Sequence, residues 1–294
     1  MNFLAPLLKS GDTIGVLAPS SYWDKEKFAE AAKILTGKGF NLIFHDQCNQ
    51  KDGQFAGTVD QKISALHEFF QNPNINAIFT LVGGNGVLHL LDEIDYSLIK
   101  QNPKLLIGFS DITALLHAIT TQTGMITYHG PTVSRLDKIK PEHVDQMLNL
   151  LTNDTLNIPV NSDIEAKGTL YGGNLSMMQS LIGTNYIPPA DEDKILFFED
   201  TNDHLSRYDR MIAHMKLAGW FNNTKAILIG DFIKSQDNPN RPFGFSIEEI
   251  VKNHVGDIPV ITGLPVGHHE NLVTLPIGAA VSLKNGLLSY KSSS

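Results

Sequence analysis

The chain of 294 residues is 42% hydrophobic and 18% charged, a composition typical of a soluble globular protein that excludes disorder and leaves room for two domains. The 23 basic and 31 acidic residues give a net charge of −8, and no basic run is present, which argues against nucleic acid as a partner. The single cysteine, Cys48, excludes an internal disulfide and any cysteine-based zinc cluster.

Neither end of the chain nor any internal run resembles a membrane or export segment. The N-terminal apolar patch is interrupted by Pro6 and is followed, not preceded, by lysine, which is not the pattern of a secretory signal. No apolar run reaches the length needed to cross a bilayer. We therefore expect a cytoplasmic protein without a membrane partner.

The first half alternates short apolar runs with helical patterns. Strands are predicted at residues 12–19, 41–44, 77–81 and 105–107, and helices at 24–37, 58–71 and from 112 onward. This alternation predicts an α/β domain with a parallel sheet that is covered by helices on both faces. Ligands of such sheets bind at the C-terminal ends of the strands, where the loop 82–86 and Ser110 are expected.

A polar segment that contains Pro159 interrupts the alternation, and we interpret it as the connection to a second, smaller α/β domain. The predicted boundaries are 1–152 for the N-terminal domain, 153–167 for the linker and 168–294 for the C-terminal domain. In the last of these, helices are predicted around 175–181 and at 204–218, strands at 195–198, 226–229 and 258–261, and a hairpin at 279–290.

Ser110 lies at a sharp corner between the strand 105–107 and the helix that begins at Ile112. Such a corner exposes a nucleophile, and the helix start supplies N–H donors for an oxyanion. The motif is Gly-x-Ser-x-Ile, so the second glycine of the usual nucleophile elbow is missing. A serine here is also among the best helix caps, which is the structural alternative.

The loop Gly83-Gly84-Asn85-Gly86 does not fit a nucleotide-binding motif. The dinucleotide pattern would need glycine at position 89, which is His89, and the Walker pattern is absent. No cofactor is therefore expected. The glycines predict either a tight turn or a backbone that approaches a substrate carbonyl closely enough to donate to an oxyanion.

Glu199 directly follows the predicted strand 195–198, and His268 lies in a loop framed by glycine and proline. Around His268 there is no helical pair of metal-ligating histidines, so no metal is expected. Together Ser110, Glu199 and His268 supply a nucleophile, a carboxylate and a general base, each at the exit of a strand. The same order occurs in α/β-hydrolases, which keeps an esterase with a single domain and a serine after the fifth strand as an alternative.

These motifs in this order resemble the serine LD-carboxypeptidases, a family that includes muramoyltetrapeptide carboxypeptidase and the microcin C immunity peptidases. The resemblance covers nearly the whole chain. It rests on residues 11–20, 83–84, 108–113, 130–131, 172–175, 198–200, 208–210, 267–268 and 275–278.

The resemblance implies that Ser110 is the nucleophile, Glu199 the carboxylate and His268 the base of a triad that assembles between the two domains. It further implies that the amides of Gly84 and Asp111 donate to the oxyanion, and we expect Gly83 and Asn85 to contact substrate in the same loop. Family members are typically cytoplasmic homodimers without a metal.

The implied reaction removes a C-terminal D-amino acid, D-alanine in a murein tetrapeptide, through an acyl-enzyme during peptidoglycan recycling. Murein-recycling relatives often carry an Arg before the glycine pair and a Tyr after it, where this chain has Val82 and Asn85. That departure favours the immunity peptidases, which cleave peptidyl-nucleotides, whereas the compact length favours the murein enzymes. A peptide-binding protein without catalysis is a further alternative.

Overall fold

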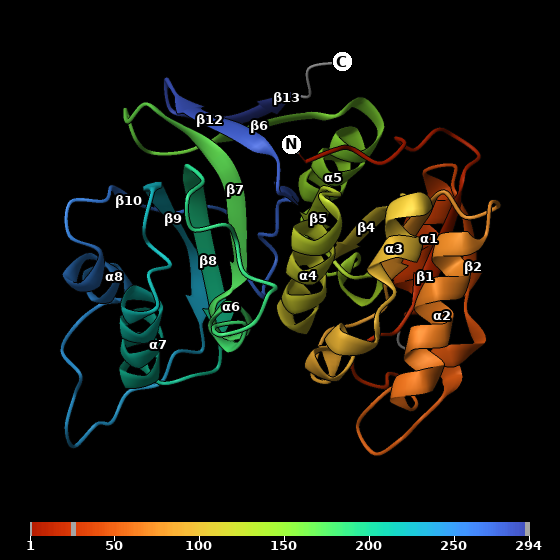
Figure 1. The fold of residues 1–294 in the computed structure, drawn as a ribbon, viewed down its shortest axis with the longest axis horizontal. Helices are drawn as coiled ribbons and strands as arrows, with labels where there is room; N and C mark the ends of the chain where they lie inside the picture. Colours follow the sequence, from red (N-terminus) through yellow and green to blue (C-terminus); the bar gives the residue numbers. More distant parts are fainter. Residues whose placement is uncertain (1, 25–27, 292–294) are drawn as a thin grey trace.

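Two sheets organise the computed structural model, which describes residues 2–24 and 28–291 (Figure 1). The expected two-domain α/β architecture is confirmed. The N-terminal sheet has the order β11-β5-β4-β3-β1-β2, in which all neighbours are parallel except β11 and β5. Its strands are β1 (Thr13–Leu17), β2 (Asn41–Phe44), β3 (Ala77–Thr80), β4 (Leu105–Gly108), β5 (Thr127–His129) and β11 (Leu275–Ile277).

The helices of this domain are α1 (Ala29–Gly37), α2 (Val59–Gln71), α3 (Tyr96–Gln101), α4 (Thr113–Thr123) and α5 (Pro141–Asn153). Of the first predicted helix, 24–37, residues 25–27 lie outside the described residues. A capping box between Thr58 and Gln61 begins α2, and Gly124 in a left-handed conformation ends α4. Nearly every residue of α4 is buried, because this helix lies between the two sheets (Figure 1).

The C-terminal sheet has the order β10-β9-β8-β7-β12-β13-β6, with β7 to β10 parallel and the remaining pairs antiparallel. The helices α6 (Leu175–Ser180), α7 (Leu205–Leu217) and α8 (Ile247–Val255) complete the domain. Its strands are β6 (Thr155–Pro159), β7 (Ala166–Asn174), β8 (Lys194–Thr201), β9 (Thr224–Ile233), β10 (Val260–Thr262), β12 (Ala280–Lys284) and β13 (Leu287–Lys291).

The predicted hairpin is present, with β12 paired to β13 and both Asn285 and Gly286 at positive φ. Two strands pair with strands of a different predicted segment. The segment interpreted as a linker holds β6, which pairs with β13, and the C-terminal half returns β11 to the N-terminal sheet. Pro159 ends an edge strand there and Pro276 lies on another, where a missing N–H does not interrupt a central ladder.

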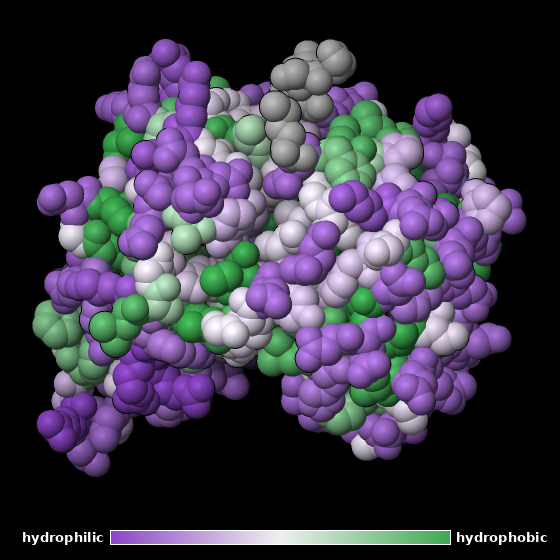
Figure 2. Space-filling model, in the orientation of Figure 1, coloured by the Kyte–Doolittle hydropathy of each residue, from purple (hydrophilic) through white to green (hydrophobic). Residues whose placement is uncertain are grey.

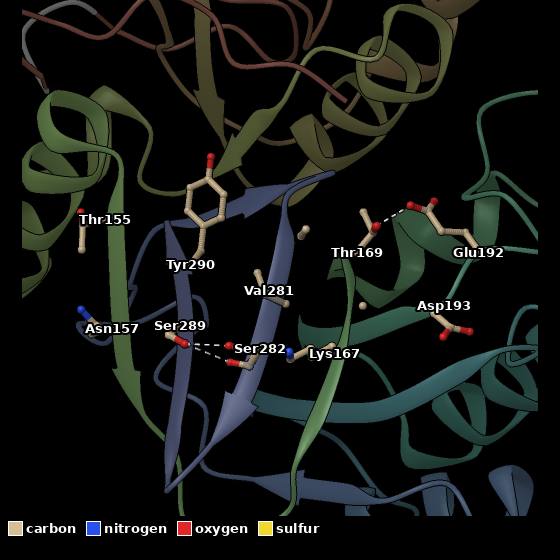
Figure 3. Close-up of a pocket in the computed structure, with 12 residues that line it drawn as sticks. Thr155, Asn157, Lys167, Thr169, Glu192, Asp193, Val281, Ser282, Ser289 and Tyr290 are labelled. Atoms are coloured by element: carbon tan, nitrogen blue, oxygen red, sulfur yellow. Dashed lines mark hydrogen bonds between the residues drawn. The ribbon is translucent and has the colours of Figure 1, made fainter. Parts of the chain in front are cut away.

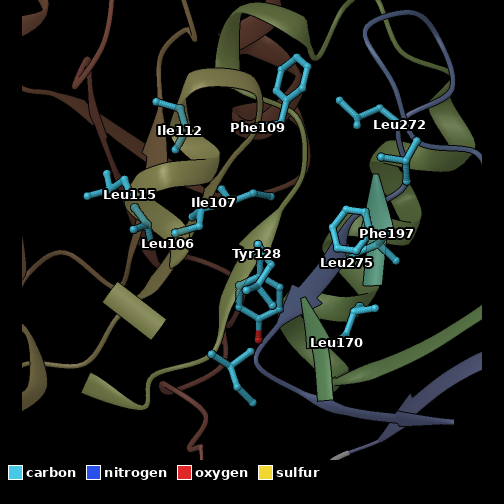
Figure 4. Packing of buried hydrophobic residues seen from close by; sticks show 14 of the residues in the cluster. Leu106, Ile107, Phe109, Ile112, Leu115, Tyr128, Leu170, Phe197, Leu272 and Leu275 are labelled. Carbon is cyan, nitrogen blue, oxygen red and sulfur yellow. The ribbon is translucent and has the colours of Figure 1, made fainter. Parts of the chain in front are cut away.

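One apolar core extends through both domains. Figure 4 shows where the domains meet, with Ile107 and Tyr128 of the N-terminal sheet near Leu170 and Phe197 of the C-terminal sheet. A large apolar contact of this kind fixes two domains relative to each other. On the face seen in Figure 2, polar side chains cover most of the surface and apolar ones are scattered among them.

Candidate active site

Ser110 lies two residues after the end of β4, and its φ of +63° places it in the left-handed region. Such a conformation costs a non-glycine residue on the order of 1 kcal/mol or more, and strain of this kind concentrates at functional sites. The N-cap of the 3₁₀ turn Ser110–Ile112 is Phe109 and that of α4 is Ile112, so Ser110 caps neither helix. The capping interpretation of this serine is therefore wrong.

The corner is tight because Gly108 has no side chain. A Cβ on Gly108 would lie 2.7 Å from Ile112 Cγ2 and closer still to Thr80 Oγ1. The side chain of Ile112 thus occupies the space beside Gly108. This packing explains how the turn tolerates isoleucine where the usual elbow has its second glycine.

The glycine loop lies directly beside the serine. A Cβ on Gly83 would come within 3.0 Å of Ser110 Cβ and 3.2 Å of its Oγ, and Gly84 has a φ of +117° that favours glycine. Asn85, expected to contact substrate, is exposed, and its N–H donates to Ser21 Oγ at 3.1 Å. Gly83 is thus the loop residue that packs against Ser110, and both Gly83 and Gly84 line the same cavity as this serine, whereas Asn85 is not among the lining residues.

The side chain of Asp111 fastens the loops around this corner. It is buried and accepts hydrogen bonds from Ser20 Oγ at 2.5 Å and from the Val87 N–H at 3.0 Å. Burial raises the pKa of the Asp111 carboxyl, while the hydrogen bond from Ser20 and the nearby Lys62 ammonium oppose the rise. Sequence reasoning assigned only the amide of Asp111 a role and missed this anchoring of its side chain.

Glu199 and His268 form a hydrogen bond of 2.6 Å between Oε2 and Nδ1. The carboxylate is fully buried and the imidazole is 17% exposed. Glu199 lies within β8, not after it as predicted, because the strand continues to Thr201. The register between β8 and β9 shifts between Phe198 and Asp200, and such irregularities redirect side chains beside active sites.

The loop that carries His268 is held from both domains. Gly267 fits against Asp231, whose N–H donates to Val266 O at 2.8 Å and whose carboxylate pairs with His269 Nε2 at 2.6 Å. From the N-terminal domain, Arg135 Nη2 donates to the carbonyl oxygens of His268 and His269, each at 3.0 Å. These contacts orient the imidazole where Glu199 and the cavity meet.

Ser110 and His268 line one cavity of about 560 Å³, together with Gly83 and Gly84. A hydroxyl of the first half and an imidazole of the second half therefore share a cleft at the domain interface, as predicted. Sequence reasoning missed the rest of its lining, because the residues come from separate loops without a motif; they include Tyr22, Trp23, Lys51, Thr132, Arg135 and Lys138. Two motifs of the sequence lie next to these loops: residues 11–20 just ahead of Tyr22, and the pair Gly130-Pro131 just ahead of Thr132.

A buried imidazole lies behind the carboxylate. His129 packs edge-on against the rings of Phe197 and Phe109, and neither of its ring nitrogens has a hydrogen-bond partner among the described residues. Burial lowers the pKa of His129 to about 4, with Glu199 opposing the change. His129 is therefore neutral at pH 7, and the charge of Glu199 is left to stabilise His268 when that ring is protonated.

A second hollow, of about 590 Å³, lies on the C-terminal sheet and contains none of these groups (Figure 3). Its lining comes mainly from β7, β12 and β13, and Thr169 donates a hydrogen bond to Glu192 at its edge. Across residues 2–24 and 28–291 no group of three His, Cys, Asp or Glu side chains is placed to hold a metal ion. In the same ranges, no helix is long and apolar enough to span a bilayer.

Two family models match the chain. The LD-carboxypeptidase N-terminal domain matches residues 14–130, and the LD-carboxypeptidase C-terminal domain matches residues 167–283. A probable murein peptide carboxypeptidase of Bacillus subtilis is 31% identical over 299 residues, which cover 96% of this chain and 92% of that protein.

Two solved structures share the fold. The microcin C7 self-immunity protein MccF in complex with aspartyl sulfamoyl adenosine has a TM-score of 0.90 at 26% identity, with 99% of each chain covered. The muramoyltetrapeptide carboxypeptidase of Oxalobacter formigenes has a TM-score of 0.84 at 26% identity, covering 95% of this chain and all of that one.

Proposed function

The chain belongs to the LD-carboxypeptidase family of peptidases, and from this premise we propose that it releases a C-terminal D-amino acid from a murein tetrapeptide by serine catalysis. One observation carries the proposal. The imidazole of His268, bound to the buried Glu199 at 2.6 Å, lines the same cavity as the strained Ser110. A single-domain esterase is set aside, since the fold has two domains and Ser110 follows β4.

In the proposed reaction, His268 Nδ1–H donates to Glu199 Oε2, which leaves Nε2 as the base that accepts the Ser110 proton. The Ser110 oxygen attacks the carbonyl carbon that precedes the terminal D-amino acid. Protonation of His268 creates an ion pair with Glu199 inside an apolar core, where the carboxylate would otherwise lie uncompensated. Glu199 thus stabilises the charge that develops on the ring.

The tetrahedral oxyanion is stabilised by the amides of Gly84 and Asp111, which flank the nucleophile. Each such donor contributes on the order of 100-fold or more in rate. His268 then gives its proton to the departing amine, and water hydrolyses the acyl-enzyme by the reverse sequence. Murein tetrapeptide, with its diamino acid joined to D-alanine, is the substrate that we assign.

Incubation with purified murein tetrapeptide, followed by mass spectrometry for free D-alanine, tests the proposal. Ser110→Ala should abolish release while the circular dichroism spectrum stays unchanged. Ser134→Ala is the matched control, because Ser134 also lines the cavity and its hydroxyl forms a hydrogen bond only with Thr132 Oγ1 among the side chains described. Release that persists in the Ser110→Ala protein would refute serine catalysis by this residue, whereas a wild-type protein that binds the peptide without releasing D-alanine would indicate a peptide-binding role.

A second candidate is cleavage of peptidyl-nucleotides or aminoacyl-nucleotides, as in microcin immunity. Two observations favour it: the high similarity to a structure that holds aspartyl sulfamoyl adenosine, and the presence of Tyr22 and Trp23 in the cavity wall, where aromatic rings could stack on a base. A parallel incubation with a peptidyl-adenylate tests it. Release of nucleotide at a higher kcat/KM than D-alanine would assign the chain to this activity.

The family resemblance further leads us to propose a cytoplasmic homodimer that acts in peptidoglycan recycling. Sedimentation velocity of the purified protein measures its oligomeric state. Fractionation of the source cells measures its location. Accumulation of murein tetrapeptide in cells that lack the gene tests the role in peptidoglycan recycling.

A further inference from the structure

The charges that line the catalytic cavity all have one sign. Among the described lining residues, Lys51, Arg135 and Lys138 carry formal charge and no carboxylate is present. The chain as a whole has a net charge of −8, so this concentration of cations runs against the overall balance. A cleft lined by one sign of charge focuses the field on ligands of the opposite sign, which here means an anionic substrate.

Of the three cations, only Arg135 contacts the segment that carries the base. Its Nη2 donates to the carbonyl oxygens of His268 and His269 at 3.0 Å each. Lys138 is exposed, and its Nζ lies 3.4 Å from Ser134 O. Lys51 is also exposed, and its Nζ lies 4.9 Å from the centroid of the Tyr22 ring. Arg135 is therefore the cation held in a fixed position beside the reacting groups.

The Arg135 guanidinium has donors left for a ligand. A guanidinium carries several N–H groups, and the two hydrogen bonds to the carbonyl oxygens use Nη2 alone. Its Nε is buried without a hydrogen-bond partner among the described residues, and no ion pair to Arg135 occurs among them. Burial lowers the pKa of this guanidinium, although Asp137 opposes the change, so its charge is incompletely compensated before substrate binds.

The chemistry of the leaving group places an anion at the same position. His268 must reach the amine nitrogen of the departing D-amino acid, and the terminal carboxylate is attached to the carbon that bears this amine. Its oxygens consequently lie within about 4 Å of the nitrogen. Arg135 is anchored to the backbone of His268 and lines the same cavity as Ser110, which makes it the cation placed to meet them.

We propose that Arg135 binds the free C-terminal carboxylate of the substrate and thereby restricts the enzyme to exopeptidase cleavage. This inference rests on the proposed carboxypeptidase function and adds the residue that recognises the chain end. Charge-assisted hydrogen bonds of this kind contribute roughly 10- to 100-fold in kcat/KM. Arg135 also holds the His268 loop, so the test must separate recognition of the carboxylate from support of the loop.

The experiment compares the murein tetrapeptide acid with the same peptide ending in D-alaninamide, which lacks the negative charge. The wild-type enzyme should prefer the acid by about 10- to 100-fold in kcat/KM. Arg135→Gln should reduce this preference to near 1, and Arg135→Lys should restore part of it. Lys140→Gln is the matched control, because Lys140 pairs with Glu270 beside the same loop but does not line the cavity.

Two results would overturn the proposal. In the first, the Arg135→Gln enzyme loses the same factor in kcat/KM on the acid and on the amide, which indicates that Arg135 only supports the loop. In the second, the Arg135→Gln enzyme keeps the wild-type preference for the acid. A calorimetric arm with Ser110→Ala protein measures binding of the acid, the amide and inorganic phosphate without turnover. If the wild-type enzyme releases no D-alanine, the proposed function fails. Carboxylate recognition is still supported in that case if the Ser110→Ala protein binds the acid and loses this binding when Arg135→Gln is added. Arg135-dependent binding of phosphate but not of the acid would show that the site takes a phosphoryl group instead.

Discussion

Acidification should destabilise this protein through two histidines that are buried in the neutral form. His129 and His117 are completely inaccessible to solvent, and burial lowers the pKa of each from 6.5 to about 4. His117 Nε2 makes one hydrogen bond, to Gly172 O at 2.8 Å, and His129 makes none that involves the described residues. The perturbation that isolates one of them is His129→Leu combined with a change from pH 7 to pH 5.

The sign of the effect follows from proton binding. Because the pKa of His129 is lower in the folded state, the unfolded chain binds more protons between pH 6.5 and pH 4, and stability falls as the pH falls through that window. With pKa values of 6.5 unfolded and about 4 folded, the loss between pH 7 and pH 5 is about 2 kcal/mol for one histidine. His129 and His117 together account for about 4 kcal/mol, a large share of a typical stability of about 5 to 15 kcal/mol.

Urea unfolding at both pH values, followed by tryptophan fluorescence and circular dichroism, measures the effect. Between pH 7 and pH 5 the free energy of unfolding should fall in both proteins. The fall should be smaller in His129→Leu than in the parent, by about 2 kcal/mol. The pKa values of Asp111 and Asp200 are raised by burial and act in the opposite direction, but they are present in both proteins and cancel in the comparison.

His204→Gln is the control, because this imidazole is exposed. The reasoning is refuted if His129→Leu and the parent lose equal stability between the two pH values. It is refuted as well if His204→Gln changes the pH dependence as much as His129→Leu does.

Three further variants and one treatment test the site and the fold. Glu199→Gln should lower kcat by about 10³- to 10⁴-fold in the D-alanine assay without unfolding the protein, and a loss below tenfold would contradict its role. In Gly83→Ala the new Cβ lies 3.0 Å from Ser110 Cβ, so kcat should fall by about tenfold or more at an almost unchanged Tm. Gly172→Ala should lower the free energy of unfolding by at least about 2 kcal/mol, because its Cβ meets the carbonyl oxygen of Phe197; an unchanged urea midpoint would oppose this. Dialysis against EDTA should leave kcat/KM unchanged, and a chelator-sensitive rate restored by a divalent metal would contradict a metal-free mechanism.

Sequence patterns located most elements because they record local burial. The buried runs of β3 and β4, the helical spacing of apolar residues in α2 and the Asn285-Gly286 turn each depend on neighbouring residues alone. The same applies to the corner at Ser110, whose shape follows from a strand, a small residue and a helix start in succession. Ordered motifs over nearly the whole chain then indicated the family.

Pairing between distant segments could not be inferred in this way. The run 275–277 is compatible with either sheet, and only the packed structure places β11 beside β5. Likewise β6 looked like a polar connection, because an edge strand with one exposed face contains alternating polar residues. The position of Glu199 within β8 depends on a register shift that no local pattern encodes.

The amino-acid sequence by itself indicated the three residues to which we assign the chemistry, since a nucleophile, a carboxylate and a base are recognisable by residue type and by their motifs. Only the tertiary structure decided what surrounds them. The cations of the cavity come from separate loops, and the neutral state of His129 results from the two sheets closing over it. The first depends on how distant loops pack around one cavity, and the second on the exclusion of water where the domains meet. Both are properties of the assembled protein, not of any short stretch of chain.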